Sequence, residues 1–509
     1  MYDPVNRCPL ISAALADAPA IYSLLPVKAL KVRSLWPSLA SPYAYRKLTC
    51  DPAPDRSPST VDSETEDPLL AAQSPGFNHP AHRTDSLAYP LRCLVLAAAL
   101  LSSLPAFAQT AAGWVATWGT AMMAADSGHG ADVTGQTLRL IVHSSVGGDK
   151  ARIWLSNRFG AVPLELGAAH LAVRIDAGPL SAADGSAILP DSDRVLTFNG
   201  NPSVTIPPGS TVVSDAVLLR VPPLTDLAVS LYLPQHTEAI TLHGGAQQVS
   251  YAANGDLTAA AELAAQSWQE RSWYFLTGVD VNAPDASAVI ALGDSIVDGN
   301  HSTQSANRRW PDDLARRLQA DPGTRAAGIL GVVNAGISGN RVLLDGTGPN
   351  AMARLDADVL DRSGARFLIL SHGINDIEAV THMHQSYGDL DKRLEWALAQ
   401  IVLRAHERGM LVFGATQMPD CRNLQCASPE GEATRQALNQ WIRTTPVFDG
   451  VIDFDSITRD PAHPFQLLPA YDSGDGVHPN DKGYQAMADG INLNLFTAPH
   501  RQTVSGGAH

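Results

Sequence analysis

The sequence predicts an all-β sandwich followed by a three-layer αβα domain with a parallel five-stranded sheet. Short alternating segments separated by Gly, Pro, Asp and Asn turns fill residues 110–285, as in antiparallel sandwiches of the jelly-roll kind. From residue 286 to 497, continuous apolar runs alternate with amphipathic stretches, which is typical of a parallel sheet covered by helices on both faces. The length of 509 residues also favours two domains, with a flexible tail at 498–509.

A secretory signal peptide is predicted inside the chain, at residues 87–108. The apolar run Leu94–Leu104 follows Arg92 and leads to Ala106-Phe107-Ala108, an A-x-A site at which cleavage falls after Ala108. The run is too short to span a bilayer, so no stable membrane insertion is expected. Residues 1–86 lie upstream of the signal and are interpreted as an untranslated stretch or as a disordered extension removed with it. The sequence therefore predicts a secreted or periplasmic protein.

Composition excludes some partners and constrains the cysteines. The net charge of −15 and the absence of a Lys/Arg run argue against nucleic acid. After the cleavage site only Cys421 and Cys426 remain, and in an oxidising compartment this C-x4-C pair predicts a local disulfide, with two free thiols as the alternative. A metal site there would need further nearby ligands, which the sequence lacks, so no metal is predicted.

The elements of the first domain follow from period-two alternation. The strongest strands are expected at Leu138–Val146, Ala151–Phe159 and Leu227–Pro234, where apolar and polar residues alternate between turns. Helical spacing is scarce in this half. The segment Leu257–Ser267 predicts a short surface helix at most.

The elements of the second domain alternate strand and helix. Strands are expected at Val289–Leu292, Gly331–Ala335, Phe367–Leu370, Met410–Ala415 and Val451–Phe454. Ligands bind such sheets at the carboxyl ends of the strands. The residues that fall just after strand ends or in the final loop are Ser295, Gly339, Asn375 and His478. Their common placement predicts one shared site.

The side chains at this predicted site suit nucleophilic catalysis. Ser295 follows an apolar strand, and Asp475 and His478 stand three residues apart near the C-terminus. A serine, a histidine and an aspartate can act as nucleophile, general base and orienting carboxylate. Asp472 is a rival for the carboxylate, but the D-x-x-H spacing favours Asp475. This set of residue types predicts acyl transfer, most simply ester hydrolysis.

Four short sequence motifs follow one another along the second domain. They are GDSI at 293–296, NAGISGNR at 334–341, GIND at 373–376 and DGVH at 475–478. Over residues 288–495 this series resembles the SGNH, or GDSL-type, hydrolase superfamily. The resemblance implies a nucleophile at Ser295, a base and its partner at His478 and Asp475, and an oxyanion hole from the Ser295 N–H, Gly339 and Asn375.

Two positions leave alternatives open. Gly336, three residues before Gly339, is the other candidate for a close backbone approach. His372 stands directly before the GIND block, where these enzymes more often have an apolar residue; it either shapes the acyl pocket or is a packed side chain.

The expected function is that of a secreted serine esterase acting through an acyl-enzyme, on acetyl or other short acyl groups of carbohydrate. No metal or organic cofactor is implied. One alternative is a lipase or arylesterase on short-chain or aryl esters, and a peptidase or thioesterase could use the same residues. An alternative of another class is a glycan-binding protein with a vestigial hydrolase domain.

Overall fold

The structure is a computed structural model. It describes residues 113–125, 130–175, 185–263, 267–383, 386–422, 425–426 and 428–497, all within one compact unit. The predicted extension 1–86, the signal peptide 87–108 and the tail 498–509 lie outside the described residues. Within the described part, a search for a helix long and apolar enough to cross a bilayer found none.

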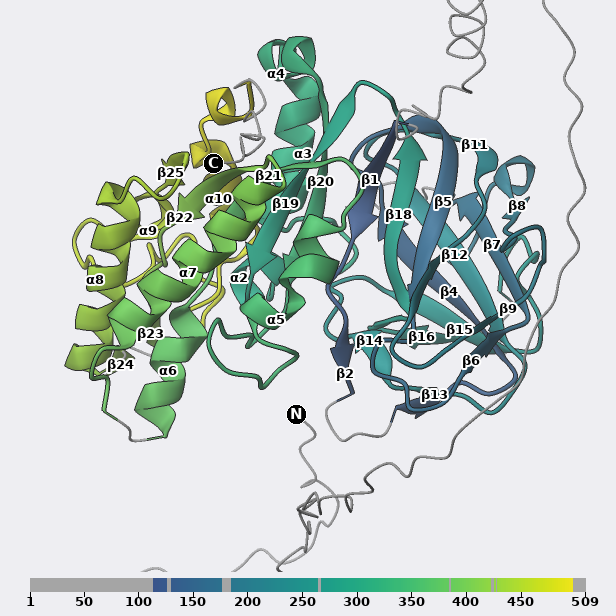
Figure 1. Ribbon diagram of the computed structural model, residues 1–509, viewed down its shortest axis with the longest axis horizontal. Helices are drawn as coiled ribbons and strands as arrows, with labels where there is room; N and C mark the ends of the chain where they lie inside the picture. Colours follow the sequence, from purple (N-terminus) through teal and green to yellow (C-terminus); the bar gives the residue numbers. More distant parts are fainter. Residues whose placement is uncertain are drawn as a thin grey trace, which may run out of the picture. The chain divides into compact units, whose positions relative to one another are not determined.

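Residues 113–282, here called the β-rich part, contain two larger antiparallel sheets (Figure 1). The first has the order β1 (Trp114–Gly119), β18 (Leu276–Asn282), β5 (Gly148–Ser156) and β10 (Thr211–Val213), with β11 (Val217–Val221) also paired to β5. The second has the order β16 (Trp268–Glu270), β15 (Ser250–Asn254), β4 (Gln136–His143), β12 (Asp226–Leu233), β7 (Ala168–Val173) and β8 (Arg194–Val195). Three of these strands, β4, β5 and β12, match the predicted segments to within a few residues.

Inward-facing side chains of both sheets share one hydrophobic core, which includes Ile153 of β5 and Leu140 of β4. Strands β4 and β12 pair along their whole length, from Asp226 opposite His143 to Leu233 opposite Gln136. Shorter strands complete this part: β17 (Trp273–Tyr274), β14 (Thr241–His243) and β2 (Met123–Ala124) form one small sheet, β13 (Glu238–Ala239) pairs with β3 (Ala131–Asp132), and β6 (Leu164–Leu166) pairs with β9 (Val204–Ile206). A 3₁₀ turn, η1, spans Pro190–Ser192.

The helix predicted at Leu257–Ser267 is wrong for the residues described there. Residues 257–263 form an irregular loop around the guanidinium of Arg139, which is fully buried. Arg139 Nη2 donates to the carbonyl oxygen of Ala260 at 2.7 Å and to that of Thr258 at 3.3 Å. A buried cation needs such acceptors, and this tertiary demand overrides the local helix propensity of an alanine-rich segment.

Residues 286–497, here called the α/β part, are built on a parallel sheet of five strands. Its order is β20 (Ile329–Gly336), β19 (Ala286–Gly293), β21 (Ala365–Ser371), β22 (Leu411–Ala415) and β25 (Gly450–Ile452). Each strand overlaps a predicted one, so an all-β region followed by an α/β fold with five parallel strands is confirmed. The register sets Gly293 opposite both Gly336 and Ser371, which brings three carboxyl ends to one edge of the sheet.

Helices cover both faces of this sheet (Figure 1). They are α2 (Ser295–Asp298), α3 (Trp310–Ala320), α4 (Pro322–Ala327), α5 (Ala351–Leu355), the π-helical turn η2 (Asp356–Leu360), α6 (Ile374–His382), α7 (Leu390–Glu407), α8 (Pro429–Thr444), α9 (Phe454–Thr458), α10 (Asp481–Gly490) and the 3₁₀ turn η3 (Leu493–Thr497). In β19, Val289 packs in the cluster that holds Leu314 of α3, whereas Ile290 packs in the cluster that holds Leu394 of α7. Burial on both faces explains why the strands read as continuous apolar runs.

Polar contacts join the β-rich part to the α/β part. Ser145 Oγ accepts a hydrogen bond from the backbone N–H of Val332 at 2.8 Å. The Arg362 guanidinium donates to the carbonyl oxygens of Thr277 and Thr120, both at 2.7 Å. These groups are buried, so each bond satisfies a donor or acceptor that water does not reach.

Candidate active site

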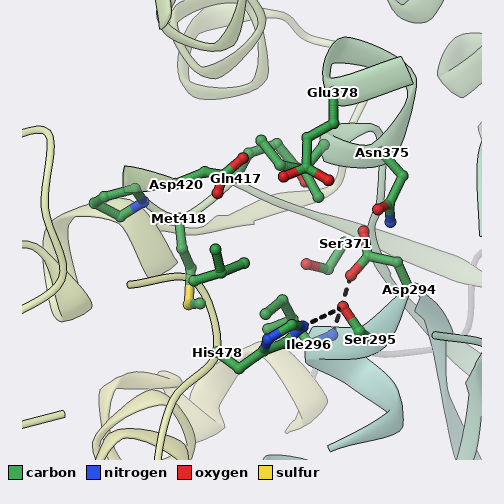
Figure 2. A pocket seen from close by; sticks show the side chains of 13 residues that line it. Asp294, Ser295, Ile296, Ser371, Asn375, Glu378, Gln417, Met418, Asp420 and His478 are labelled. Carbon is green, nitrogen blue, oxygen red and sulfur yellow. Dashed lines mark hydrogen bonds between the residues drawn. The ribbon is translucent and has the colours of Figure 1, made fainter. Parts of the chain in front are cut away.

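Ser295 is the first residue of α2, directly beyond the end of β19. The preceding residue, Asp294, caps the helix by accepting the Ile296 N–H at 3.1 Å. Ser295 Oγ lies 2.9 Å from Nε2 of His478, which comes from the loop before α10 (Figure 2). Residues 183 positions apart in the chain thus meet in one hydrogen bond.

Asp475 fixes the other side of the His478 ring. Its Oδ2 lies 2.6 Å from Nδ1, and its Oδ1 accepts the backbone N–H groups of Val477 and His478 at 2.9 and 2.8 Å. Burial alone would raise the pKa of Asp475, but these hydrogen bonds outweigh it and hold the pKa far below its ordinary value. The carboxylate is therefore ionised, so Nδ1 carries the proton and Nε2 faces the serine hydroxyl as an acceptor.

The rival carboxylate, Asp472, has a different task. Its Oδ1 accepts the N–H groups of Gly474 and Gly476 at 2.8 and 3.0 Å, which shapes the loop that carries Asp475. The structure thus brings Asp475, as the spacing predicted, against the imidazole of His478.

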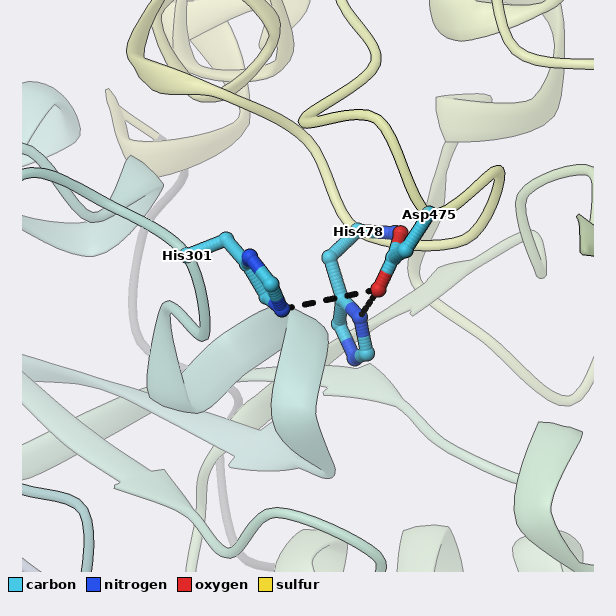
Figure 3. A group of neighbouring side chains, drawn as sticks. All are labelled: His301, Asp475 and His478. Carbon is cyan, nitrogen blue, oxygen red and sulfur yellow. Dashed lines mark hydrogen bonds and ion pairs between the residues drawn. The ribbon is translucent and has the colours of Figure 1, made fainter. Parts of the chain in front are cut away.

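A second histidine, His301, stacks on His478. The His301 ring stacks on the His478 ring with centroids 5.2 Å apart, and His301 Nε2 lies 3.5 Å from Asp475 Oδ2 (Figure 3). The donor atoms of His301, Asp475 and His478 lie within 4.8 Å of one another, so among the described residues this is the group chemically able to hold a metal ion. Sequence reasoning missed His301, because nothing in its local pattern distinguishes it.

The two glycines of the NAGISGNR block have separate roles. A Cβ on Gly336 would lie 2.3 Å from the backbone nitrogen of Asp298, so Gly336 permits the close approach of α2. Gly339 has φ +77°, a left-handed conformation that favours glycine. On either side of it, Ser338 donates its N–H to Asp298 Oδ2 and Asn340 donates to Ile337 O.

Asn375, at the start of α6, stands beside this turn. Its Nδ2 donates to the carbonyl oxygen of Asn340 at 3.0 Å, and its side chain lines the pocket in front of Ser295 (Figure 2). Gly339 is not among the residues that line this pocket. The hydrogen bond from Asn375 nevertheless joins the two predicted oxyanion-hole segments.

The pocket itself is small, with a cavity volume of about 30 Å³. Ile296, Ile374, Met418 and Val477 give it apolar walls, and Glu378, Gln417 and Asp420 give it polar ones. A cavity of this size holds a group of a few atoms. Asp294 also lines the pocket, and burial raises the pKa of its carboxyl to about 7.

Comparison with known proteins agrees with this geometry. Residues 291–486 match the GDSL-like lipase/acylhydrolase family. That range contains Ser295, His478 and Asp475.

Residues 291–486 form a GDSL-type acylhydrolase domain. The protein is accordingly a hydrolase that acts on esters.

Solved structures similar to the GDSL domain include three esterases. A carbohydrate acetylesterase family member from Sinorhizobium meliloti is 18% identical, with 42% of this chain and 100% of that chain covered and a TM-score of 0.32. A catalytic mutant of an acetylxylan esterase from Geobacillus stearothermophilus is 20% identical, with 41% and 94% covered and a TM-score of 0.32. The aryl esterase of M. smegmatis is 17% identical, with 40% and 95% covered and a TM-score of 0.31. A search of curated proteins found no match to this chain.

A buried arginine braces the GDSL domain under the site. Arg354 of α5 donates to Gly293 O at 2.8 Å, to Ala335 O at 2.7 Å and to Asn340 Oδ1 at 3.0 Å, and it pairs with Asp358 at 3.0 Å. It thereby ties the ends of β19 and β20 to the turn at Asn340. The sequence shows Arg354 only as part of an amphipathic helix, so no local signal could have found it.

His372 is a packed side chain rather than part of the acyl pocket. It is fully buried, and its Nε2 lies 3.1 Å from Asn340 Oδ1. Burial and the nearby charge of Arg354 hold the pKa of His372 well below its ordinary value, so the ring is neutral. A neutral ring with its proton on Nε2 donates to Asn340 and helps to hold the turn.

The predicted disulfide lies partly outside the described residues. The backbones of Cys421 and Cys426 pair as opposite residues of a two-stranded ribbon, β23 (Cys421–Arg422) and β24 (Gln425–Cys426). Their side chains are not among the described atoms, so the disulfide stays a prediction.

Proposed function

We propose that this protein is a secreted serine esterase that removes acetyl or other short acyl groups from carbohydrate, with Ser295 as nucleophile. The observation that supports it most directly is the continuous chain of two short hydrogen bonds, 2.9 Å from Ser295 Oγ to His478 Nε2 and 2.6 Å from His478 Nδ1 to Asp475 Oδ2. A serine hydroxyl becomes a strong nucleophile only when such a base accepts its proton.

The first half of the reaction forms the acyl-enzyme. His478 Nε2 accepts the Ser295 proton as Oγ attacks the ester carbonyl carbon, and Asp475 stabilises the imidazolium. The carbonyl oxygen becomes an oxyanion, for which the Ser295 N–H, the Gly339 N–H and Asn375 Nδ2 are the donors. The bond to the alcohol oxygen then breaks, and His478 returns the proton to that oxygen.

The second half releases the acid. Water attacks the acyl carbon while His478 Nε2 accepts its proton, and a second oxyanion forms in the same place. The bond to Ser295 Oγ breaks, and the proton on His478 returns to the serine. Attack and departure use one base, so the site needs only the groups already named.

The pocket supports the choice of a short acyl group and a sugar alcohol. A cavity of about 30 Å³ beside Ser295 suits a small acyl group such as acetyl. The carboxylates of Glu378 and Asp420 at its polar side can accept hydrogen bonds from sugar hydroxyls. Export rests on the signal peptide that the sequence predicts.

The test is hydrolysis of acetylated sugars and of aryl esters with acyl chains of two to twelve carbons, by the wild type and by Ser295→Ala. Ser287→Ala, at the other end of β19, is the matched control. We expect hydrolysis of acetyl esters in the wild type and the control, loss in Ser295→Ala, and a steep fall with chain length. Equal activity in Ser295→Ala would refute the nucleophile, and a preference for long chains would refute the substrate class.

A further inference from the structure

The β-rich part contributes a buried histidine to the vicinity of the candidate site. His243 of β14 is 1% exposed. Its Nε2 lies 3.1 Å from Oδ1 of Asp298, on α2, and its Nδ1 lies 2.9 Å from the carbonyl oxygen of Ala121. Asp298 stands three residues after Ser295 and is equally buried.

The protonation of His243 follows from its neighbours. A carbonyl oxygen can only accept, so Nδ1 must donate its proton to Ala121 O. The other ring nitrogen, Nε2, forms the hydrogen bond with the Asp298 carboxylate. Trp273 packs beside the ring, with centroids 5.4 Å apart at an angle of 32°, and fixes its plane.

The second oxygen of Asp298 reaches the turn that carries Gly339. Oδ2 accepts the Ser338 backbone N–H at 3.0 Å and the Ser338 hydroxyl at 2.7 Å. The next residue is Gly339, whose N–H is one of the proposed oxyanion donors. One carboxylate therefore couples the helix of the nucleophile, the Gly339 turn and a side chain of the β-rich part.

We propose that His243 is a positioning residue, which acts through Asp298 to orient the Gly339 N–H toward the oxyanion. The β-rich part is then a component of the catalytic apparatus. This inference rests on the proposed function. Donors of an oxyanion hole act only when held at the place where charge develops, so loosening the turn lowers kcat more than it raises KM.

The experiment compares His243→Phe, Asp298→Asn and Thr277→Val with the wild type on an acetyl ester. Phenylalanine keeps a ring against Trp273 but removes both N–H donors. Thr277→Val is the matched control, since Thr277 is buried between the same two parts, bonded to Thr120 and Arg362, without a link to Ser338. We expect kcat to fall by about 10- to 100-fold in the first two variants, KM to change by less than about threefold, and the control to keep its kcat.

Two further readouts separate positioning from general stability. The affinity for methylboronic acid, which forms a tetrahedral adduct with a serine hydroxyl, should fall by the same factor as kcat/KM, whereas inhibition by acetate should not change. His243→Gln, whose amide can donate to Asp298, should recover part of kcat. The double variant His243→Phe/Asp298→Asn should lose no more kcat than the more impaired of the two single variants, because the two residues act through one another.

The outcomes distinguish this inference from the proposed function. If His243→Phe folds and keeps the full kcat while Ser295→Ala is inactive, the positioning role of His243 is overturned and the proposed function stands. If His243→Phe does not fold, Asp298→Asn and His243→Gln decide in the same assays, and full kcat in both overturns it. An inactive wild type, or a Ser295→Ala variant as active as the wild type, overturns the proposed function instead.

Discussion

Arg354 Nη2 donates a hydrogen bond of 2.8 Å to the carbonyl oxygen of Gly293, two residues before Ser295. The same guanidinium donates to Ala335 O and Asn340 Oδ1, so one side chain fixes the ends of two strands and the turn at Asn340. Its burial makes these bonds obligatory, because neither the cation nor its acceptors can turn to water.

Replacement of this arginine should destabilise the protein strongly. Arg354→Met removes a buried donor from Gly293 O and Ala335 O and leaves Asp358 with only the longer ion pair to Arg362, at 3.8 Å, at a cost of about 3–5 kcal/mol in the free energy of unfolding. Arg404→Met is the control, because the Arg404–Asp356 pair is exposed and such pairs contribute at most about 1 kcal/mol. Urea unfolding of both variants measures the difference. Similar losses would contradict the account of Arg354 as a brace.

Loss of the charge at Asp475 should impair catalysis without unfolding the loop. Asp475→Asn keeps the backbone hydrogen bonds at Oδ1 but no longer favours the Nδ1-protonated ring, so kcat should fall by about 10³–10⁴. Asp460→Asn is a matched control, since Asp460 and His463 show the same D-x-x-H spacing with Oδ2 and Nδ1 3.1 Å apart. In steady-state kinetics on an acetyl ester, Asp460→Asn should keep the wild-type kcat.

The amide of Asn375 should act mainly on the transition state. Asn375→Ala removes one proposed oxyanion donor, and kcat should drop by about 10²–10³ with little change in KM. A variant that raises KM and keeps kcat would show instead that Asn375 binds the ground state of the substrate.

Stability should depend on pH through Asp294. Burial raises the pKa of this carboxyl to about 7, so the folded protein retains a proton that the unfolded chain releases near pH 4. The stabilisation is therefore complete at low pH and is lost as the pH rises through 7. Asp294→Asn keeps the cap to Ile296 and does not titrate. As the pH rises from 5 to 8, its free energy of unfolding, measured with urea, should therefore gain about 1–4 kcal/mol on that of the wild type. A difference independent of pH would contradict the shift.

The sequence predicts the sheet of the GDSL domain and the meeting of Ser295 with His478 because both leave local marks. A strand buried on both faces is a continuous apolar run, and catalytic loops follow strand ends. Spacing alone does not suffice, since Asp460 and His463 repeat the D-x-x-H pattern on an exposed loop. Asp475 and His478 differ from that pair because they belong to the series of four blocks, and the structure places Ser295 Oγ 2.9 Å from the His478 ring.

The supports of the site could not be predicted in this way. Arg354, Asp298 and His243 are polar residues in segments that read as amphipathic helix, turn and strand. Their roles depend on acceptors far away in the chain, such as Gly293 O for Arg354 and Ser338 for Asp298. The helix predicted at Leu257–Ser267 was wrong for the same reason, because the buried cation of Arg139 outweighs the helix propensity of that segment.

In the proposed reaction Ser295 Oγ is the nucleophile, and His478 activates it. The most direct measurement is intact-protein and peptide mass spectrometry after brief exposure to a fluorophosphonate, in the wild type, Ser295→Ala and His478→Ala. We expect one phosphonyl group on Ser295 in the wild type, none in Ser295→Ala, and labelling slowed by at least about 10³-fold in His478→Ala. A label on another residue, or equal rates with and without the imidazole, would contradict it.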